Sequence, residues 1–142
     1  MKKITVLGGS GFLGSHLCDI LSNKGYQVRI FDLKKPKVIK NNQKVYKGNI
    51  LDRKKLSKAI RGSDFVFNFA GLADLDDAKK KPIETVNSNI LGTLNALFIC
   101  KKHNVKRFIQ ASSIYANAEE GGFYGKGKKA AEDYIEEYHK TY

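Results

Sequence analysis

The chain has 142 residues, of which 42% are hydrophobic and 28% charged, a composition typical of one globular domain and too short for two. Its net charge of +12 comes mostly from lysine, whereas a nucleic-acid surface would mix in more arginine and aromatic residues, so nucleic acid is an unlikely partner. No apolar run approaches the roughly 20 residues that cross a bilayer, and the start does not resemble a signal peptide. We therefore expect one soluble, cytoplasmic unit over residues 1–142, with no membrane partner.

The pattern predicts strands that alternate with helices along the chain. Strands are expected at 3–7, 27–31, 43–47, 65–69 and 105–111, and helices at 12–24, 52–60, 82–102 and 124–138. This alternation predicts an α/β fold with a doubly wound parallel sheet and helices on both faces. Cys18 and Cys100 fall in apolar helical patterns, and the cysteines and histidines lack ligand spacing, so we expect buried reduced thiols and no metal site.

Three glycines stand between the first strand and the first helix. Gly8, Gly11 and Gly14 form the pattern G-x-x-G-x-x-G, which permits a tight turn, close approach of a pyrophosphate and close packing of helix on strand. The peptide N–H groups at the start of the helix, at Phe12 and Leu13, would face the phosphates. This arrangement predicts a dinucleotide site.

Asp32 ends the second predicted strand, where a carboxylate can accept hydrogen bonds from the ribose hydroxyls of the adenosine. This position favours NAD over NADP. Lys34 and Lys35 follow two and three residues later, and their charge could accept a 2′-phosphate, so NADP remains an alternative at this point. The alternative for Asp32 itself is a residue that only forms the turn after the strand.

Polar or small residues also follow the other strands. Asn49 and Asp52 follow the third strand, and Asp52 is also expected to cap the next helix. The ends of the fourth and fifth strands carry Ala70, Gly71, Ser112 and Ser113. Ligands of doubly wound sheets lie outside the carboxyl ends of the strands, so together these residues predict a nucleotide crevice.

Tyr124 and Lys128 form a Tyr-x-x-x-Lys pattern at the start of the last helix, which places both side chains on one face. A tyrosine acts as a base only when a nearby cation favours the phenolate, and Lys128 can supply that charge. Ser113 adds a hydroxyl for a carbonyl or alcohol oxygen. These three residues are the candidate catalytic set, although a Tyr and a Lys four apart are often only surface residues.

These motifs resemble the extended short-chain dehydrogenase/reductase family, in particular its NAD-dependent nucleotide-sugar epimerases and dehydratases. The matching segments are 6–17, 48–52, 67–71, 89–93, 112–113 and 124–132. The resemblance implies that the sheet is of Rossmann type, with strand order 3-2-1-4-5. It also implies an adenine contact at Ile50 and Asp52, and a structural or cofactor contact at Asn89. It also assigns cofactor contacts to Ala70, Gly71, Ser112, Tyr124 and Lys128.

The resemblance implies reversible hydride transfer with NAD on a nucleotide-sugar substrate. Ile114 and Tyr115 stand where dehydratases carry an Asp-Glu pair after the catalytic hydroxyl, which favours epimerisation or simple oxidoreduction over dehydration. The loop 114–123 is also shorter than is usual in the family. The alternatives are a dehydratase or reductase that uses NAD or NADP, and a dinucleotide-binding module without catalytic activity.

The family also implies a homodimer formed by the last two helices. Their apolar stripes contain Leu94, Leu97, Phe98, Lys101, Ala131, Tyr134, Ile135 and Tyr138. Family members continue beyond the catalytic helix into further strands and a sugar-binding domain, whereas this sequence ends at Tyr142. We therefore expect a unit that lacks the C-terminal substrate domain, leaves its fifth strand as an edge, and binds NAD without turning over a sugar efficiently.

Overall fold

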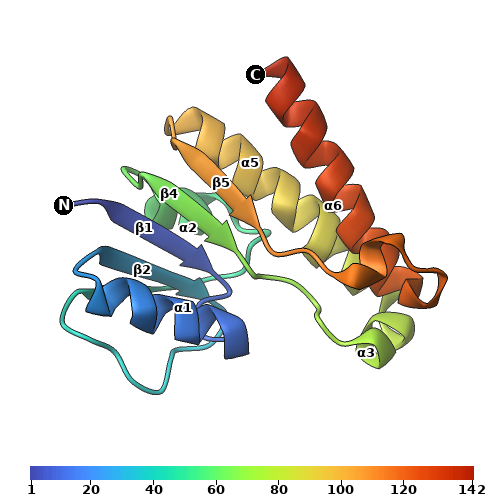
Figure 1. Cartoon of the computed structure of the whole chain (residues 1–142), viewed down its shortest axis with the longest axis horizontal. Coiled ribbons are helices and arrows are strands. Elements are labelled where there is room, and N and C mark those ends of the chain that lie inside the picture. Colours follow the sequence, from blue (N-terminus) through green and yellow to red (C-terminus); the bar gives the residue numbers. More distant parts are fainter.

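Five parallel strands form one sheet in the order β3-β2-β1-β4-β5 in the computed structural model, which describes residues 1–142 (Figure 1). The strands are β1 (Lys3–Leu7), β2 (Gln27–Asp32), β3 (Gln43–Lys47), β4 (Phe65–Asn68) and β5 (Arg107–Gln110). The predicted fold class and strand order are therefore confirmed. β1 lies at the centre, with Val6 paired to Ile30 of β2 and to Phe67 of β4.

Helices cover both faces of the sheet, as the sequence predicted. α1 (Phe12–Asn23) packs Cys18 and Leu21 against alternate side chains of β1 and β2. On the other face, α2 (Arg53–Ile60) and α5 (Gly92–Lys102) bury Leu56 and Ile99 in a second apolar cluster that includes Leu7. Because side chains alternate across a strand, β1 supplies both clusters and is buried on both faces.

The expected helix 82–102 is interrupted. It consists of α4 (Pro82–Thr85), a π-helical segment η1 (Val86–Leu91) and α5, and it is preceded by a short helix, α3 (Leu75–Lys80), that the sequence analysis did not predict. Thr93 donates its hydroxyl proton to the Asn89 carbonyl oxygen, at 2.8 Å, and the Asn89 side chain turns towards the segment after β4. Single π turns of this kind occur often at functional sites.

The last helix, α6 (Gly122–Thr141), begins two residues before the predicted start. Two short 3₁₀ helices, η2 (Ile114–Asn117) and η3 (Glu119–Gly121), fill the segment that was expected to be a plain loop. Gly121 and Gly125 lie so close to the Tyr115 carbonyl oxygen that a Cβ at either position would overlap it. Glycine at both positions therefore lets the start of α6 pack against η2.

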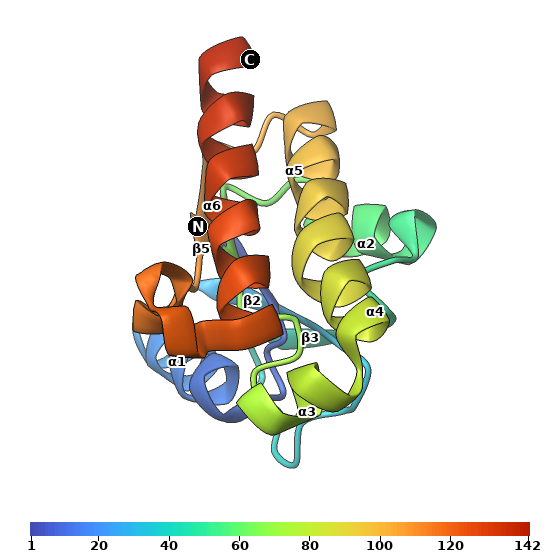
Figure 2. The same cartoon turned by 90° about the vertical axis from the view of Figure 1, so that its right-hand side faces the viewer.

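α6 lies beside α5 and against α3, and its C-terminal end extends beyond the rest of the molecule (Figures 1 and 2). β5 is an edge of the sheet within residues 1–142. Cys18 and Cys100 are buried free thiols, and burial raises the pKa of both to about 12. No helix combines the length and apolar character that a membrane span requires.

Candidate active site

The glycine-rich turn joins β1 to α1 with backbone packed directly on backbone. Gly8 has φ +75°, a conformation that favours glycine, and its N–H donates to the Phe31 carbonyl oxygen at 2.8 Å. A Cβ on Gly14 would overlap the Gly8 carbonyl oxygen, so only glycine lets the first turn of α1 sit this close to the turn before it. The turn and the helix start therefore form one rigid unit.

The first turn of α1 presents backbone donors that the protein does not use. The amides of Phe12, Leu13 and Gly14 have no backbone or side-chain acceptor, no side chain caps the helix, and no acidic residue stands in its first turn. The Phe12 and Leu13 side chains are 81% and 61% exposed. Three free N–H groups at the positive end of a helix provide a place for an anion such as a phosphate.

Asp32 links the end of β2 to the same turn. One carboxylate oxygen accepts from the Ser10 amide at 3.0 Å, and the other accepts from the Lys34 amide at 3.0 Å. Ser10 also donates its hydroxyl proton to the Lys34 carbonyl oxygen at 2.8 Å. These bonds fix the carboxylate beside the glycine-rich turn, where the sequence analysis expected a ribose contact.

The end of β4 is organised by buried amide side chains. Asn68 accepts from the Ala70 amide at 3.1 Å and donates to the Gln110 side chain of β5 at 2.8 Å. Asn89 accepts from the Leu72 amide at 2.8 Å and donates to the Leu72 carbonyl oxygen at 2.9 Å. Asn89, expected as a structural or cofactor contact, therefore holds the segment that contains Gly71.

The two residues that were expected to contact the adenine, Ile50 and Asp52, both have structural roles in the protein. Ile50 is 6% exposed and belongs to the apolar cluster under α5. The Asp52 carboxylate caps α2 by accepting from the Lys54 and Lys55 amides, and the Lys55 amide bond is the largest of the effects that lower the pKa of this carboxyl. Helix capping by Asp52 is confirmed, and the adenine contacts stay predictions.

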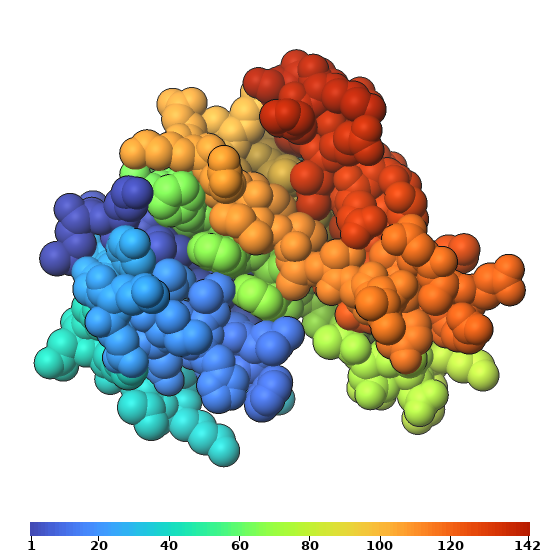
Figure 3. All heavy atoms as spheres, in the orientation of Figure 1, coloured from blue at the N-terminus to red at the C-terminus, as the bar shows by residue number.

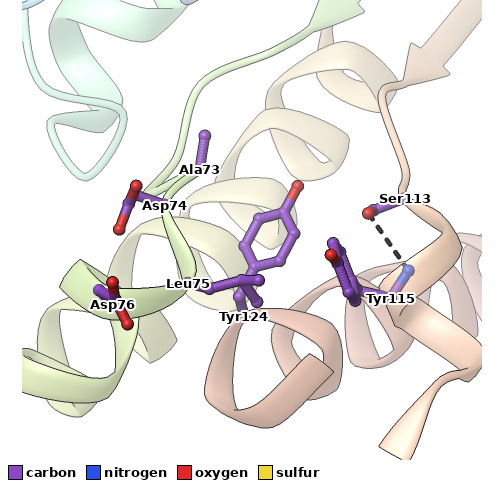
Figure 4. A pocket seen from close by; sticks show the side chains of 7 residues that line it. All are labelled: Ala73, Asp74, Leu75, Asp76, Ser113, Tyr115 and Tyr124. Atoms are coloured by element: carbon purple, nitrogen blue, oxygen red, sulfur yellow. Dashed lines mark hydrogen bonds between the residues drawn. The ribbon is translucent and has the colours of Figure 1, made fainter. Parts of the chain in front are cut away.

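Ser113 and Tyr124 line one pocket with a volume of about 400 Å³ (Figure 4). The Ser113 hydroxyl oxygen accepts from the Tyr115 amide at 3.3 Å, which places Ser113 at the start of η2. The Tyr124 and Tyr115 rings meet edge to face, with centroids 6.4 Å apart. The structure thus brings the two hydroxyl groups of the expected set to one cavity, although 10 residues separate them in the sequence.

Lys128, the third residue of the expected set, does not line this pocket and is only 8% exposed. Its Nζ donates to the Ala111 carbonyl oxygen at 2.9 Å and lies 5.6 Å from the centre of the Tyr124 ring. Burial lowers the pKa of Lys128. The Ala111 carbonyl also accepts from the Gln110 side chain at 3.2 Å. Lys128 is therefore held between the end of β5 and Tyr124.

Ser112 points away from this set, because its hydroxyl donates to a carboxylate oxygen of Glu132 on α6. No motif in the sequence marks the opposite wall of the pocket, which consists of Ala73, Asp74, Leu75 and Asp76. An Asp before an acidic first turn and a lysine-rich last turn is a helix-start signal that could have located α3. Its position opposite Tyr124 depends on the Asn89 contacts and could not be read from the sequence.

A hollow separates the start of α1 from α3 and η2 on the face shown in Figure 3. The glycine-rich turn borders it on one side, and the segments that carry the pocket residues border it on the other. A doubly wound parallel sheet with a glycine-rich turn, a fixed acidic residue after β2 and hydroxyl groups after β5 defines a nucleotide-binding domain of Rossmann type.

The sequence profile of the NAD dependent epimerase/dehydratase family matches residues 4–142, and the chain belongs to this family. It is 35% identical over 126 residues to dTDP-D-glucose 4,6-dehydratase of Dictyostelium discoideum, a match that covers 80% of this chain and 29% of that protein. The family consists of enzymes, and NAD, the cofactor expected from the sequence, is the cofactor that its description names.

Solved structures share the fold. UDP-glucose 4-epimerase of Thermotoga maritima, solved with UDP-glucose, superposes with a TM-score of 0.87 at 31% identity, covering 99% of this chain and 52% of that one. UDP-glucose 4-epimerase of Bifidobacterium longum, solved with NAD⁺ and UDP, has a TM-score of 0.87 at 31% identity, covering 97% of this chain and 49% of that one. The chain spans about half the length of these structures.

Proposed function

We propose that residues 1–142 provide the NAD-binding and proton-transfer part of a nucleotide-sugar 4-epimerase. The observation that carries this proposal is the meeting of Ser113 and Tyr124 at one pocket, with Lys128 buried near the Tyr124 ring. The epimerases solved with UDP-glucose, or with NAD⁺ and UDP, support the substrate class and the cofactor. The Ile114–Tyr115 pair, in place of the acidic pair of dehydratases, favours epimerisation over dehydration.

The residues present fit a dinucleotide. The free amides of Phe12, Leu13 and Gly14 would hold the pyrophosphate, because they lack protein acceptors at the positive end of α1. Asp32, already fixed by the Ser10 and Lys34 amides, would accept from the adenosine ribose hydroxyls. A carboxylate at this place disfavours a 2′-phosphate, so NAD is preferred to NADP.

Each residue of the catalytic set has a distinct role. NAD, when bound, would supply a hydride acceptor for the sugar carbon and a hydride donor for the opposite face of the same carbon, which inverts its configuration. Tyr124 removes the proton from the sugar hydroxyl as that carbon loses hydride, and it returns the proton later. Ser113 donates a hydrogen bond to the same oxygen. Lys128 places a positive charge near the Tyr124 ring and stabilises negative charge on its oxygen.

The proposal is tested by titrating the chain with NAD and NADP in a calorimeter and by following the conversion of UDP-glucose to UDP-galactose, which we expect to be slow and therefore measure at high chain concentration. We expect NAD to bind more tightly than NADP, and Tyr124→Phe to keep NAD affinity while abolishing proton transfer and therefore conversion. Tyr134→Phe, an exposed tyrosine of the same helix, is the matched control. Tighter binding of NADP, or unchanged conversion by Tyr124→Phe, would contradict the proposal.

The same proposal includes self-association through α5 and α6. These helices lie side by side, and Leu97 is buried, whereas Phe98 and Tyr134 stay 43% and 46% exposed. A second copy could cover the exposed part of these stripes. Sedimentation at high protein concentration tests this interface, and a pure monomer there would contradict it.

A further inference from the structure

The pocket beside Tyr124 has the opposite charge to the chain as a whole. The sequence holds 26 basic and 14 acidic residues, yet the pocket is lined by two acidic side chains, Asp74 and Asp76, and by no lysine or arginine. Figure 4 shows both carboxylates on one side of the Tyr124 ring and Ser113 on the other. In a lysine-rich chain, this local excess of negative charge requires an explanation.

Helix capping accounts for only part of this negative charge. Asp74 caps α3 by accepting from the Asp77 amide at 2.9 Å. Asp76 accepts no hydrogen bond from the protein, and neither residue belongs to an ion pair of the structure. Asp76 is exposed and keeps both carboxylate oxygens available to a ligand in the pocket.

The proposed role of Tyr124 determines which part of the substrate faces these two carboxylates. Under the proposed function, Tyr124 takes a proton from a sugar hydroxyl, which requires an approach of roughly 3 Å between the two oxygens. The sugar must then occupy the pocket that Tyr124 and Ser113 line, and its volume of about 400 Å³ is within the range of small-molecule sites. The wall formed by Asp74 and Asp76 therefore faces the sugar.

We propose that Asp74 and Asp76 make this pocket selective for a nucleotide linked to a neutral, hydroxyl-rich sugar and reject a nucleotide linked to a uronic acid. This inference rests on the proposed function. An ionised carboxylate only accepts hydrogen bonds, so it pairs with the hydroxyl donors of a neutral sugar. The same carboxylates repel the carboxylate of a uronic acid, and no basic residue of the lining compensates.

The test compares UDP-glucose with UDP-glucuronic acid, which differ in a hydroxymethyl and a carboxylate group. Each is titrated into the chain in the calorimeter, with and without saturating NAD. We expect the wild-type chain to bind UDP-glucose about tenfold more tightly at low salt, which corresponds to about 1.4 kcal/mol. Asp76→Asn should reduce this preference at least about threefold, because it removes one repelling charge and keeps the side-chain shape.

Asp77→Asn is the matched control. It makes the same change of charge on the same helix, but Asp77 does not line the pocket, so the preference should not change. Raising the salt to about 0.5 M should reduce the wild-type preference, because repulsion between exposed charges is screened and steric selection is not.

The proposal is overturned if Asp76→Asn and the double variant Asp74→Asn/Asp76→Asn keep the wild-type preference, or if the wild-type chain binds neither sugar nucleotide. A chain that fails to bind NAD contradicts the proposed function instead. The ratio of the two affinities measured without NAD still tests the acidic wall, so the two failures are distinguishable.

Discussion

Replacing Asn89 by alanine tests how far one side chain holds the wall of the pocket beside Tyr124. Asn89 is 3% exposed, and its amide spans the Leu72 backbone, accepting from the N–H at 2.8 Å and donating to the carbonyl oxygen at 2.9 Å. A typical intramolecular hydrogen bond contributes about 1 kcal/mol net, so losing both should lower the free energy of unfolding by about 2 kcal/mol. In a chain of this size, that corresponds to a drop of roughly 7 °C in Tm.

Asn87→Ala provides the matched control. Asn87 lies in the same π-helical segment, and its side chain forms no hydrogen bond in the structure, so it reports the effect of the Asn-to-Ala change on the helix alone. Urea unfolding of both variants gives the difference that belongs to the Leu72 contacts. Free energies of unfolding that agree within about 0.5 kcal/mol would refute the reasoning, because the two hydrogen bonds to Leu72 would then contribute less than a single typical hydrogen bond.

Three further outcomes are expected. Gly14→Ala should lower the free energy of unfolding by about 1–3 kcal/mol and weaken NAD binding, because the added Cβ forces α1 away from the Gly8 carbonyl; urea unfolding and calorimetry measure both effects. Burial lowers the pKa of Lys128, so its charge disfavours folding below that pKa and the penalty fades as pH rises towards the value of an unfolded lysine. The free energy of unfolding of Lys128→Met should therefore be about 1 kcal/mol higher than that of wild type at neutral pH. This advantage should shrink at about pH 10, whereas a gap independent of pH would contradict the reasoning. Burial also lowers the pKa of His103, so between neutral pH and about pH 5 wild type should lose more stability than His103→Gln in urea unfolding.

The regular part of the fold was predictable because it depends on local patterns. Strand and helix periods along the chain were sufficient for a doubly wound parallel sheet, and the family resemblance implied the order of its strands. The missed elements depend on distant contacts. The π turn around Asn89 arises where that side chain reaches Leu72, 17 residues away in the sequence. α6 starts early despite the usual preference against glycine in a helix, because Gly121 and Gly125 pack closely on the Tyr115 carbonyl oxygen.

The candidate site divides in the same way. Spacing alone placed Tyr124 and Lys128 on one helix face and Ser113 after β5, and the structure brings Ser113 and Tyr124 to one pocket. Spacing did not reveal that other candidate residues already form hydrogen bonds within the protein. Ser112 pairs with Glu132 of α6. The opposite wall at Asp74 and Asp76 carries no motif, and only the folded chain shows that it faces Tyr124.

The central place of β1 sets the order in which the sheet can assemble. β1 pairs on one side with β2 and on the other with β4. Residues 3–7 therefore cannot complete their pairing until the chain has been synthesised to Asp32 on one side and to Asn68 on the other. Every pairing is parallel, and no hairpin can form early and act as a local nucleus. During synthesis, one edge of an apolar strand therefore stays open until β4 has left the ribosome, and a chain released before that point would expose it to aggregation.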